Sequence, residues 1–512
     1  MDRTTPTTIP AAVASAAREF GDAEALAEPG GARLGYRELH DRAREVARAL
    51  IADGIAPGDR VAVWGPNTAA WVLAALGALT AGATLVPVST RFTGAEALDV
   101  ISRSGARALF VDNDFLGVDR LAALRAAAGP DPAGSLAGLA LVVPVTGADW
   151  TGFVERKLAT LRPYAAARAA AVSEEDVSDI LFTSGTTGRS KGAMSSHRSA
   201  LSVARAWADH GGLAFGDRYL VVNPFFHSFG LKAGILACLV SGATMVPLPV
   251  FDPAAAMRVI ETERITVLPG APTIYQTLLD HPDRGRFDLS SLRLAVTGAA
   301  SVPTALVERM GRELSFRVVL TAYGLTEAVV ATMCRPGDAP EIVARTCGRA
   351  AAGFTVRIGD GGEVLLRGPN LMLGYLDDPV ATAEAVDPDG WLHTGDIGTL
   401  DAAGYLTITD RLKDMYICGG FNVYPAEVEQ VLARLDGVAE SAVVGVPDQR
   451  MGEVGRAYVV LRAGRVVSPE AVVDFCRQRL ANYKVPRQVV FRDALPRNPS
   501  GKVLKRLLRN ER

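Results

Sequence analysis

The most informative run of this chain is Thr183-Ser184-Gly185-Thr186-Thr187-Gly188-Arg189-Ser190-Lys191-Gly192. It contains three glycines and five hydroxyl residues, and it directly follows Asp179-Ile180-Leu181-Phe182. Such a run has few bulky side chains and many free backbone N–H groups, so it can fold closely around a polyphosphate. The common phosphate loop needs Gly-Lys-Ser/Thr, whereas here Ser190 precedes Lys191 and Gly192 follows it. We predict a polyphosphate cradle of another type, and a flexible surface linker is the alternative.

Five further motifs follow along the chain: Tyr323-Gly324-Leu325-Thr326-Glu327, Thr394-Gly395-Asp396, Asp410-Arg411-Leu412-Lys413-Asp414, Gly419-Gly420-Phe421-Asn422-Val423-Tyr424-Pro425 and Pro496-Arg497-Asn498-Pro499-Ser500-Gly501-Lys502. One such motif alone is a weak signal. All of them in this order resemble the adenylate-forming superfamily, which contains acyl-CoA synthetases, peptide-synthetase adenylation domains and luciferases. The resemblance extends from about Thr7 to the end of the chain.

Some details resemble one branch of that superfamily. They are the run from Asp179 to Thr183 with Gly188–Lys191, the run Asn223–His227 and the run Asp414–Cys418. These runs look like the actinobacterial ligases of sterol breakdown, which give CoA thioesters to a bicyclic indanedione propanoate. The resemblance therefore implies an acid:CoA ligase of steroid ring degradation.

Length and composition narrow the classes of protein. A chain of 512 residues is too long for one ordinary domain and predicts about three or four units of core. Apolar residues make up 49% and charged residues 21%, which is globular composition. The net charge of −2 indicates no polyanion-binding face, so we expect no nucleic-acid partner. A homodimer is one assembly that the sequence leaves open.

Cysteine usage and the apolar runs indicate a cytoplasmic protein. The five cysteines are scattered without a Cys-x-x-Cys pair, which argues against a disulfide framework or a zinc site and fits a reducing cytosol. The N-terminal run Met1–Pro6 has no apolar signal core. The most apolar stretch, Ala233–Val250, is interrupted by Gly, Ser, Thr and Pro, and predicts a buried helix and a strand instead of an integral membrane segment.

Apolar runs of strand length alternate with helical intervals up to about Gly353, which predicts parallel sheets with helices on their faces. The predicted strands are Arg60–Trp64, Thr84–Val88, Ala108–Val111, Leu141–Val143, Tyr219–Val222, Thr244–Leu248, Thr266–Pro269, Arg293–Thr297 and Val318–Thr321. Asn67 and Thr68 form a predicted cap before a helix that extends to Ala81.

After Gly353 the pattern changes. The runs Phe354–Ile358, Glu363–Arg367 and Tyr405–Thr409 are short and alternating, which predicts a small antiparallel unit. A compact α+β tail follows Arg411. We therefore predict an α/β fold with a large N-terminal domain, residues 1–410, made of parallel α/β subdomains plus the small antiparallel β unit. The remaining residues, 411–512, form a small α+β C-terminal domain, which the resemblance implies is mobile.

ATP and Mg²⁺ have candidate ligands. The resemblance implies that Thr183, Ser184, Gly185, Thr186, Thr187, Gly188 and Lys191 hold the β- and γ-phosphates. Glu327 is a hard carboxylate, and Mg²⁺ prefers oxygen ligands and keeps several waters, so one carboxylate that bridges to phosphate suffices. The predicted metal ligands are Glu327 and Thr183. A carboxylate at a helix N-terminus is the alternative for Glu327.

The nucleoside has candidate partners as well. The resemblance assigns Tyr323 to adenine stacking, Thr326 to the α-phosphate with Gly324 beside them, and Gly298-Ala299-Ala300 to the adenine side. That tripeptide alone cannot be told from an ordinary strand-to-helix turn. Asp396 can accept both ribose hydroxyls with its two oxygens, and the resemblance adds Arg411. A turn aspartate is the alternative for Asp396.

The C-terminal motifs carry the predicted chemistry. The ammonium of Lys502 can reach the acyl carboxylate and the α-phosphate together and neutralise charge as the acyl oxygen attacks phosphorus. A solvated lysine is the alternative, against which the Gly/Pro-shaped run before it argues. The resemblance places Lys413 at the hinge between the domains, where a plain surface lysine is the alternative. Gly419-Gly420 offers a side-chain-free surface for the pantetheine arm of CoA.

The acyl pocket is the least determined part. The resemblance makes His227 the gate of this pocket near the thiol channel, and a satisfied core histidine is the alternative. We expect a mostly apolar lining that includes Leu325, Val329, Val330, Thr332 and Met333. The segment Asn223–Gly230 has no aspartate that could hold a substrate amine, which weakens an amino-acid substrate.

We therefore expect an AMP-forming acid–thiol ligase. Its small-molecule partners are a carboxylic acid, ATP and CoA, with Mg²⁺. The alternatives are a medium-chain fatty-acyl or aryl-alkanoyl CoA ligase, and a standalone adenylation enzyme that loads a separate carrier protein. A luciferase-like oxygenase and a catalytically silent binding protein are further alternatives, which the sequence does not favour.

Overall fold

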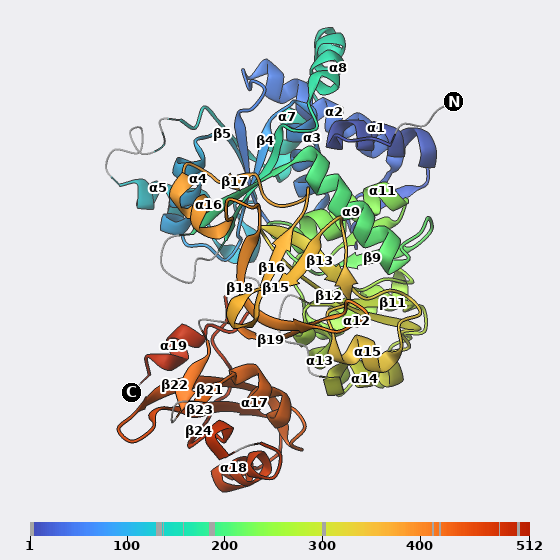
Figure 1. Cartoon of the computed structure of the whole chain (residues 1–512). Helices are drawn as coiled ribbons and strands as arrows, with labels where there is room; N and C mark the ends of the chain where they lie inside the picture. The colour runs from blue at the N-terminus through green and yellow to red at the C-terminus, as the bar shows by residue number, and fades with distance from the viewer. Residues whose placement is uncertain are drawn as a thin grey trace.

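The structure is a computed structural model of the chain. It describes residues 5–129, 136, 138–156, 158–183, 190–298, 304–411, 414–418, 421–480, 482–498 and 502–511. Figure 1 shows a large body that carries the N-terminus and a smaller domain, in orange and red, that follows β19 (Leu406–Arg411).

The central sheet of the large domain has its described strands in the order β17-β8-β7-β4-β3-β5-β6. Their bounds in that order are Gly374–Tyr375, Lys191–Ser196, Val177–Thr183, Thr84–Val88, Arg60–Trp64, Ala106–Val111 and Leu141–Pro144. The strands β7, β4, β3, β5 and β6 run parallel, whereas β8 and β17 are antiparallel to their neighbours. One edge of the sheet therefore departs from the parallel arrangement that the sequence predicts.

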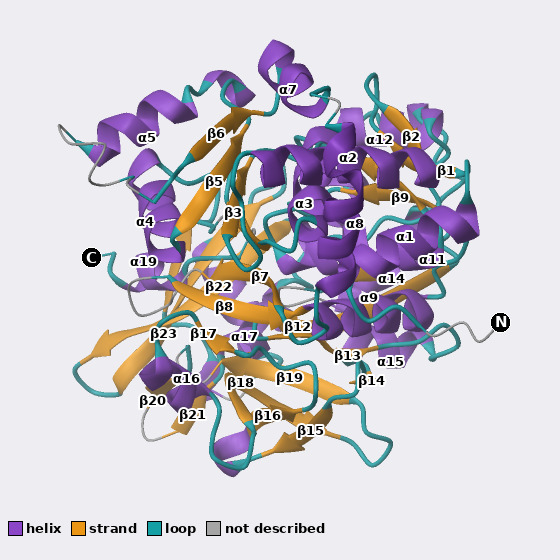
Figure 2. Cartoon of the chain, turned by 90° about the horizontal axis from the view of Figure 1, so that it is seen from above, coloured by secondary structure: helices purple, strands orange, loops and turns teal. Residues whose placement is uncertain are grey.

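Helices cover both faces of this sheet (Figure 2). The helices in the first part of the chain are α1 (Ile9–Phe20), α2 (Tyr36–Ala52), α3 (Ala69–Thr80), α4 (Gly94–Ser104), α5 (Arg120–Ala128), α7 (Gly147–Val154) and α8 (Arg162–Ala171), with the short 3₁₀ turns η1 (Phe115–Gly117) and η2 (Ala159–Leu161). On β3, Val61 and Val63 share a core with α2 and α3. Ala62 and Trp64 share another core with α4 and α5. Strand side chains alternate between faces, so β3 is apolar on both, as in a sheet covered on two sides.

A second curved sheet follows. Its described strands have the orders β2-β1-β10-β9 and β11-β12-β13-β14, and isolated bridges at Val267 join β9 to β11. The bounds are β1 (Glu24–Ala27), β2 (Arg33–Gly35), β9 (Arg218–Val221), β10 (Thr244–Pro247), β11 (Leu294–Thr297), β12 (Val318–Leu325), β13 (Ala328–Met333) and β14 (Arg349–Ala350). The predicted strand Thr266–Pro269 is present only as these single bridges.

The helices of this region are α9 (His197–Gly211), α10 (Ser228–Gly230), the π-helix η3 (Leu231–Leu236), α11 (Ala237–Ser241), α12 (Pro253–Thr262), α13 (Pro272–Leu279), η4 (Arg284–Arg286), α14 (Thr304–Glu313) and α15 (Pro340–Arg345). The segment from η3 to β10 is buried, which confirms the helix and strand expected there. Among the described residues, no helix is both long enough and apolar enough to span a bilayer.

The small antiparallel unit that the sequence predicts after Gly353 is present. Its strands have the order β15-β16-β18-β19 and pair antiparallel throughout. The bounds not yet given are β15 (Thr355–Ile358), β16 (Glu363–Arg367), β18 (Leu392–Leu400), α16 (Pro379–Ala385) and η5 (Asp360–Gly362).

The C-terminal domain has a core of its own, built from residues between Tyr416 and Leu508. Its strands have the order β21-β20-β23-β22, with β24 parallel to β23. The bounds are β20 (Tyr416–Cys418), β21 (Phe421–Val423), α17 (Pro425–Leu432), β22 (Val438–Asp448), β23 (Gly452–Leu461), α18 (Pro469–Arg477), η6 (Asn482–Lys484), β24 (Gln488–Phe491) and α19 (Lys505–Arg509). The α/β fold with a separate α+β C-terminal domain is thus confirmed. The exact domain boundary between residues 410 and 411, at the end of β19, stays a prediction.

Candidate active site

The predicted phosphate loop joins two antiparallel strands. Thr183 ends β7, Lys191 begins β8, and the two residues face each other in register. The Thr183 hydroxyl donates to the Lys191 carbonyl oxygen at 3.3 Å. The common phosphate loop leads from a strand into a helix, whereas here the described residues on either side of the loop are strands, so the device is a different one. The cradle residues Ser184, Gly185, Thr186, Thr187 and Gly188 lie outside the described residues.

Glu327 lies in the turn between β12 and β13. A strand follows it, so the alternative of a helix N-terminal carboxylate is wrong. Its Oε1 accepts a hydrogen bond from the Tyr375 hydroxyl at 2.7 Å. The ring of Tyr375 in turn carries the Lys191 ammonium, whose Nζ lies 5.0 Å from the ring centroid. A single tyrosine therefore contacts both the predicted metal carboxylate and the predicted phosphate cation.

Asp396 lies inside strand β18, directly opposite Arg411 of β19, so the alternative of an ordinary turn aspartate is wrong. Its side chain is buried, and Oδ2 accepts a hydrogen bond from the Tyr323 hydroxyl at 2.6 Å. Gly395 before it has φ 67°, a conformation that favours glycine. The predicted adenine and ribose residues thus meet directly, while the side chain of Arg411 lies outside the described part of the chain.

The neighbours of Tyr323 are held by close backbone approach. A Cβ on Gly298 would lie 2.4 Å from the Ala322 carbonyl oxygen, and one on Gly324 would lie 2.6 Å from the Val330 nitrogen. Any side chain at either position would therefore push the strands apart. Gly298 directly follows β11, whose Thr297 pairs with Thr321 of β12, and Thr326 lies in the same turn as Glu327. The role of Gly298 on the adenine side stays a prediction. Ala299 and Ala300 lie outside the described residues.

His227 caps the short helix α10. Its Nδ1 accepts from the Phe229 backbone N–H at 3.2 Å, and burial lowers the pKa of His227 to about 4. The imidazole is therefore neutral at pH 7 and carries its proton on Nε2. This local bond is also what the alternative of a satisfied histidine predicts, so the role of His227 as the gate of the acyl pocket stays a prediction.

The side chain of Asn67 holds the loop that leads to His227 in place through hydrogen bonds. The sequence predicts a helix cap for it, but Thr68 is the cap of α3, and Asn67 is buried behind it. Its Nδ2 donates to the carbonyl oxygens of Val221 and Asn223 at 3.0 and 2.9 Å, and its Oδ1 accepts from the Phe225 N–H at 2.8 Å. One amide therefore fixes the segment before His227.

Part of the predicted acyl lining belongs to the core. Thr332 and Met333 have no exposed surface, and the Thr332 hydroxyl donates to the Cys347 carbonyl oxygen at 2.7 Å. The expectation that these two residues line the pocket is wrong, because they point to opposite faces of β13 and both faces of this strand are buried. Val329 and Val330 are nearly buried, and Leu325 is half-buried.

Lys502 lies at the base of a closed loop in the C-terminal domain. The backbone N–H of Lys502 donates to Asn498 Oδ1 at 2.8 Å, and the Asn498 N–H donates to the Lys502 carbonyl oxygen at 2.8 Å. Arg91 of the large domain donates to the Asn498 carbonyl oxygen at 3.4 Å. The lysine that the sequence singles out is half-buried, on a loop whose base touches the large domain. Lys413, Gly419 and Gly420 lie outside the described residues.

Sequence reasoning missed three supporting residues: Tyr375, Asn67 and Arg103. Arg103 of α4 donates to the Ser190 carbonyl oxygen at 2.7 Å, with its guanidinium 5.3 Å from the centre of the Phe182 ring, so it contacts both flanks of the phosphate loop. Asp99, one turn earlier, lies 3.0 Å from the same guanidinium. Only the i,i+4 spacing of Asp99 and Arg103 was visible in the sequence, and that spacing is typical of any surface helix.

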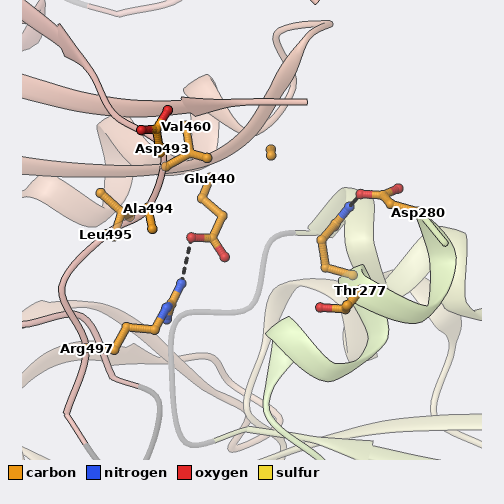
Figure 3. Close-up of a pocket in the computed structure, with 10 residues that line it drawn as sticks. Thr277, Asp280, Glu440, Val460, Asp493, Ala494, Leu495 and Arg497 are labelled. Carbon is orange, nitrogen blue, oxygen red and sulfur yellow. Dashed lines mark hydrogen bonds and ion pairs between the residues drawn. The ribbon is translucent and has the colours of Figure 1, made fainter. Parts of the chain in front are cut away.

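A pocket of about 400 Å³ lies between α13 and the C-terminal domain (Figure 3). Thr277 and Asp280 line one side, and Glu440 and Arg497, which form an ion pair at 2.7 Å, line the other. None of the predicted site residues lines it. We therefore attribute this pocket to the contact between the domains and not to the nucleotide site.

Metal ligands are sparse. Among the described residues, no group of three or more His, Cys, Asp or Glu side chains could hold a metal ion by itself. All five cysteines are free thiols, four of them buried. Mg²⁺ needs only one or two carboxylates when phosphate oxygens and waters complete its shell, so the carboxylate of Glu327 and the hydroxyl of Thr183 fit this ion by donor chemistry.

Comparison with known proteins identifies the family. Residues 13–376 match the family model of AMP-binding enzymes, and residues 427–502 match that of the AMP-binding enzyme C-terminal domain. The chain is 60% identical over 516 aligned residues, 99% of both chains, to the 3-[(3aS,4S,7aS)-7a-methyl-1,5-dioxo-octahydro-1H-inden-4-yl]propanoyl:CoA ligase of Rhodococcus jostii (strain RHA1). The ligase with the same name from Mycobacterium tuberculosis (strain ATCC 25618 / H37Rv) is 59% identical over 98% of both chains.

A solved structure has the same architecture over the whole length. The anthranilate CoA ligase AuaEII in complex with anthranoyl-AMP matches with a TM-score of 0.89 at 26% identity, over 99% of this chain and 97% of that one. The resemblance inferred from the motifs is confirmed over nearly the whole sequence. The chain therefore belongs to the family of AMP-binding enzymes.

Proposed function

We propose that this chain is an AMP-forming acid:CoA ligase whose acid is the bicyclic indanedione propanoate of steroid ring degradation. One observation carries the proposal, namely 60% identity over 99% of the chain to a ligase named for that propanoyl group. Membership of the AMP-binding enzymes supports ATP as the activating nucleotide and CoA as the thiol. The enzyme is accordingly an acyl-CoA synthetase of lipid metabolism.

The first half-reaction joins the acid to AMP. A carboxylate oxygen of the acid attacks the α-phosphorus of ATP, and the bond from that phosphorus to the bridging oxygen breaks to release pyrophosphate. Thr183 and Lys191 bind the departing phosphates, and Thr326 binds the α-phosphate. Lys502 holds the acid and stabilises the charge that develops on the α-phosphoryl oxygens.

Glu327 and the Thr183 hydroxyl would hold Mg²⁺, which when bound neutralises phosphate charge. Tyr323 and Asp396 bind adenine and ribose, and the hydrogen bond of 2.6 Å between them shows that the two side chains lie side by side. Arg411, opposite Asp396 across the β18–β19 pair, completes the ribose contact. These roles follow from the motif resemblance and from the neighbourhood in which the described residues lie.

The second half-reaction forms the thioester. The CoA thiol gives its proton to solvent and its sulfur attacks the acyl carbon. The bond between that carbon and the oxygen it shares with phosphorus then breaks, and AMP leaves with that oxygen. Gly419 and Gly420 would let the pantetheine arm pass, and Lys413 would act as the hinge for the C-terminal domain. A His227 that is neutral at pH 7 can donate Nε2–H at the mouth of the acyl pocket without placing a charge beside an apolar acid.

One buried carboxylate of the large domain is already paired, which supports an acid without an amino group. Asp179 is a buried carboxylate of β7, but the Lys232 ammonium lies 3.1 Å from it and balances its charge. Asp179 is therefore not available to hold a substrate amine. A medium-chain fatty acid or an aryl-alkanoate remains the alternative acid, because each fills an apolar pocket as well.

The test is a panel of acids with purified enzyme, ATP, Mg²⁺ and CoA, in which AMP, pyrophosphate and thioester are measured together. We expect the indanedione propanoate to have a higher kcat/KM than palmitate or a cinnamic acid. Short fatty acids should be weak substrates, since each missing methylene contact costs only about 1–3 kcal/mol. Palmitate with the highest kcat/KM would overturn the substrate, and release of ADP and phosphate would overturn the reaction.

A cytoplasmic location and a homodimer are the further parts of this proposal. The free thiols of all five cysteines suit a reducing compartment. Light scattering of the purified protein measures its mass against the 53.9 kDa of one chain. A mass near that value would rule out the homodimer.

A further inference from the structure

Tyr375 lies on a segment that ties the Glu327 turn to the start of β8. Met372 N–H donates to the Glu327 carbonyl oxygen, and Leu376 N–H donates to the Gly192 carbonyl oxygen, both at 2.8 Å. Strand β17 pairs antiparallel with β8, with Tyr375 opposite Ala193. The backbone of Tyr375 is therefore fixed to both elements that carry predicted phosphate ligands.

The turn of chain before Tyr375 admits only glycine. Gly374 has φ 140°, and a Cβ there would lie 3.1 Å from Cγ2 of Thr382. The Tyr375 N–H donates to the hydroxyl of the same threonine at 2.9 Å. The side chain of Tyr375 extends to Glu327 and Lys191.

The contacts of the Tyr375 side chain leave the Glu327 carboxylate and the Lys191 ammonium able to bind a ligand. The Tyr375 hydroxyl donates to Glu327 Oε1 at 2.7 Å, while Oε2 accepts no hydrogen bond from any residue within the described part of the chain. The Lys191 ammonium lies over the ring face, and this contact uses none of its N–H donors on an oxygen acceptor.

We infer that Tyr375 is a positioning residue that sets the Glu327 carboxylate and the Lys191 ammonium on either side of one phosphate site, so that a metal ion and the cation can act on the same triphosphate. The inference rests on the proposed function, since it takes the nucleotide to bind at Glu327 and Lys191. It adds to that function a residue outside all six motifs. A purely structural tyrosine would stabilise the fold without coupling metal and nucleotide binding.

The test measures equilibrium binding and not turnover. The affinity of α,β-methylene-ATP is determined by calorimetry with Mg²⁺ and again with EDTA, for the full-length enzyme and for Tyr375→Phe and Tyr375→Leu. Phenylalanine keeps the ring under Lys191 but removes the hydrogen bond to Glu327. Leucine removes both contacts. Thermal melting of each variant reports whether the fold is intact.

Tyr405 offers a matched control. Its hydroxyl donates to Asp338 at 2.7 Å, and the Arg349 guanidinium lies 4.9 Å from its ring centroid. It therefore has the same pair of contacts, carboxylate and cation, outside the predicted site. Tyr405→Phe should leave both nucleotide affinities unchanged.

We expect Tyr375→Phe to lose roughly tenfold in affinity with Mg²⁺ and little with EDTA, because a hydrogen bond to a charged group is typically worth about a factor of ten or more. Tyr375→Leu should also lose roughly two- to fivefold with EDTA, as expected for a lost cation–π contact. If Tyr375→Phe binds as tightly as the unmodified enzyme in both conditions, the inference is overturned while the proposed function stands. If the unmodified enzyme binds no nucleotide, the predicted site fails, and the inference with it.

Discussion

Replacing Lys232 by methionine removes one charge of an ion pair in the protein interior. The side chains of Lys232 and Asp179 are 2% and 3% exposed, and their charged atoms lie 3.1 Å apart. The Lys232 ammonium also donates to the Ser195 hydroxyl at 2.6 Å, and the Ser178 hydroxyl donates to Asp179 Oδ2 at 2.7 Å. The pair therefore joins the π-helix η3 to both strands of the phosphate-loop hairpin.

The expected loss of stability follows from the contacts that Asp179 retains in the variant. In Lys232→Met the carboxylate retains its bond to Ser178, but Oδ1 loses its counter-charge. Breaking a buried pair from one side costs about 3–5 kcal/mol, because an uncompensated charge stays in the interior. With roughly 2.1 cal/mol/K of unfolding entropy per residue, a large domain of about 400 residues melts roughly 4–6 °C lower for that loss.

A second variant separates charge from packing. Lys232→Met/Asp179→Asn removes both charges and nearly preserves both shapes. Replacing a buried pair by neutral groups of similar volume is often close to neutral, so the double variant should recover most of the lost melting temperature. The assay is thermal unfolding at one fixed scan rate, since large chains often unfold irreversibly.

Two results would refute this reasoning. A Lys232→Met protein that melts within about 1 °C of the unmodified enzyme would mean that the buried carboxylate is compensated elsewhere. Equal destabilisation of the single and the double variant would mean that the stem of Lys232, and not its charge, provides the stability.

Three further outcomes are expected. Lys502→Ala should slow adenylate formation roughly a hundred- to thousandfold while it spares thioester formation from a supplied acyl-adenylate. The control is Lys505→Ala, three residues away on α19, whose lysine pairs with Glu429 at 2.7 Å. Equal loss in both half-reactions would mean that Lys502 is structural. Gly420→Leu should slow thioester formation while it spares adenylate formation, since a bulky side chain blocks the predicted thiol path. An equal fall in the rates of both half-reactions would contradict that path. Burial lowers the pKa of His197 to about 4 from an ordinary 6.5, so the unfolded chain binds this proton more tightly; the free energy of unfolding should be level above about pH 6.5 and fall toward pH 4. Melting temperatures across this range should fall less steeply in His197→Gln, and parallel curves for both proteins would contradict the assignment.

The sequence pointed to the residues proposed to bind the nucleotide, but not to the residues that position them. Glu327, Tyr323 and Asp396 stand in motifs whose residue order is diagnostic, and the fold gives each of them a site partner or neighbour. Tyr375 was missed because its strand is only two residues long and its partner Glu327 lies 48 residues away. Asn67 was assigned to a helix cap, because a cap is a local pattern, whereas its contacts reach across 156 and 158 residues.

Burial was also hard to predict where periodicity is ambiguous. In β13 every residue is buried, so alternation gave no sign that Thr332 and Met333 point into the core. In the sequence, Lys232 directly precedes the apolar run Ala233–Val250. Its counter-charge, Asp179, is distant in sequence, so only the fold shows that the lysine is internal. Long-range pairing of this kind leaves no trace in local patterns.

The bond between Tyr323 and Asp396 has a thermodynamic consequence for the proposed ligand. The buried Oδ2 of Asp396 accepts a hydrogen bond from the Tyr323 hydroxyl at 2.6 Å. A ribose hydroxyl that took that place would exchange one hydrogen bond for another, and such exchanges contribute little net free energy. The protein's contacts to the nucleoside would then determine which base is accepted, while its contacts to the phosphates would supply most of the affinity. Adenosine alone should be a poor competitor, and the AMP left after pyrophosphate and thioester formation should dissociate without a high barrier.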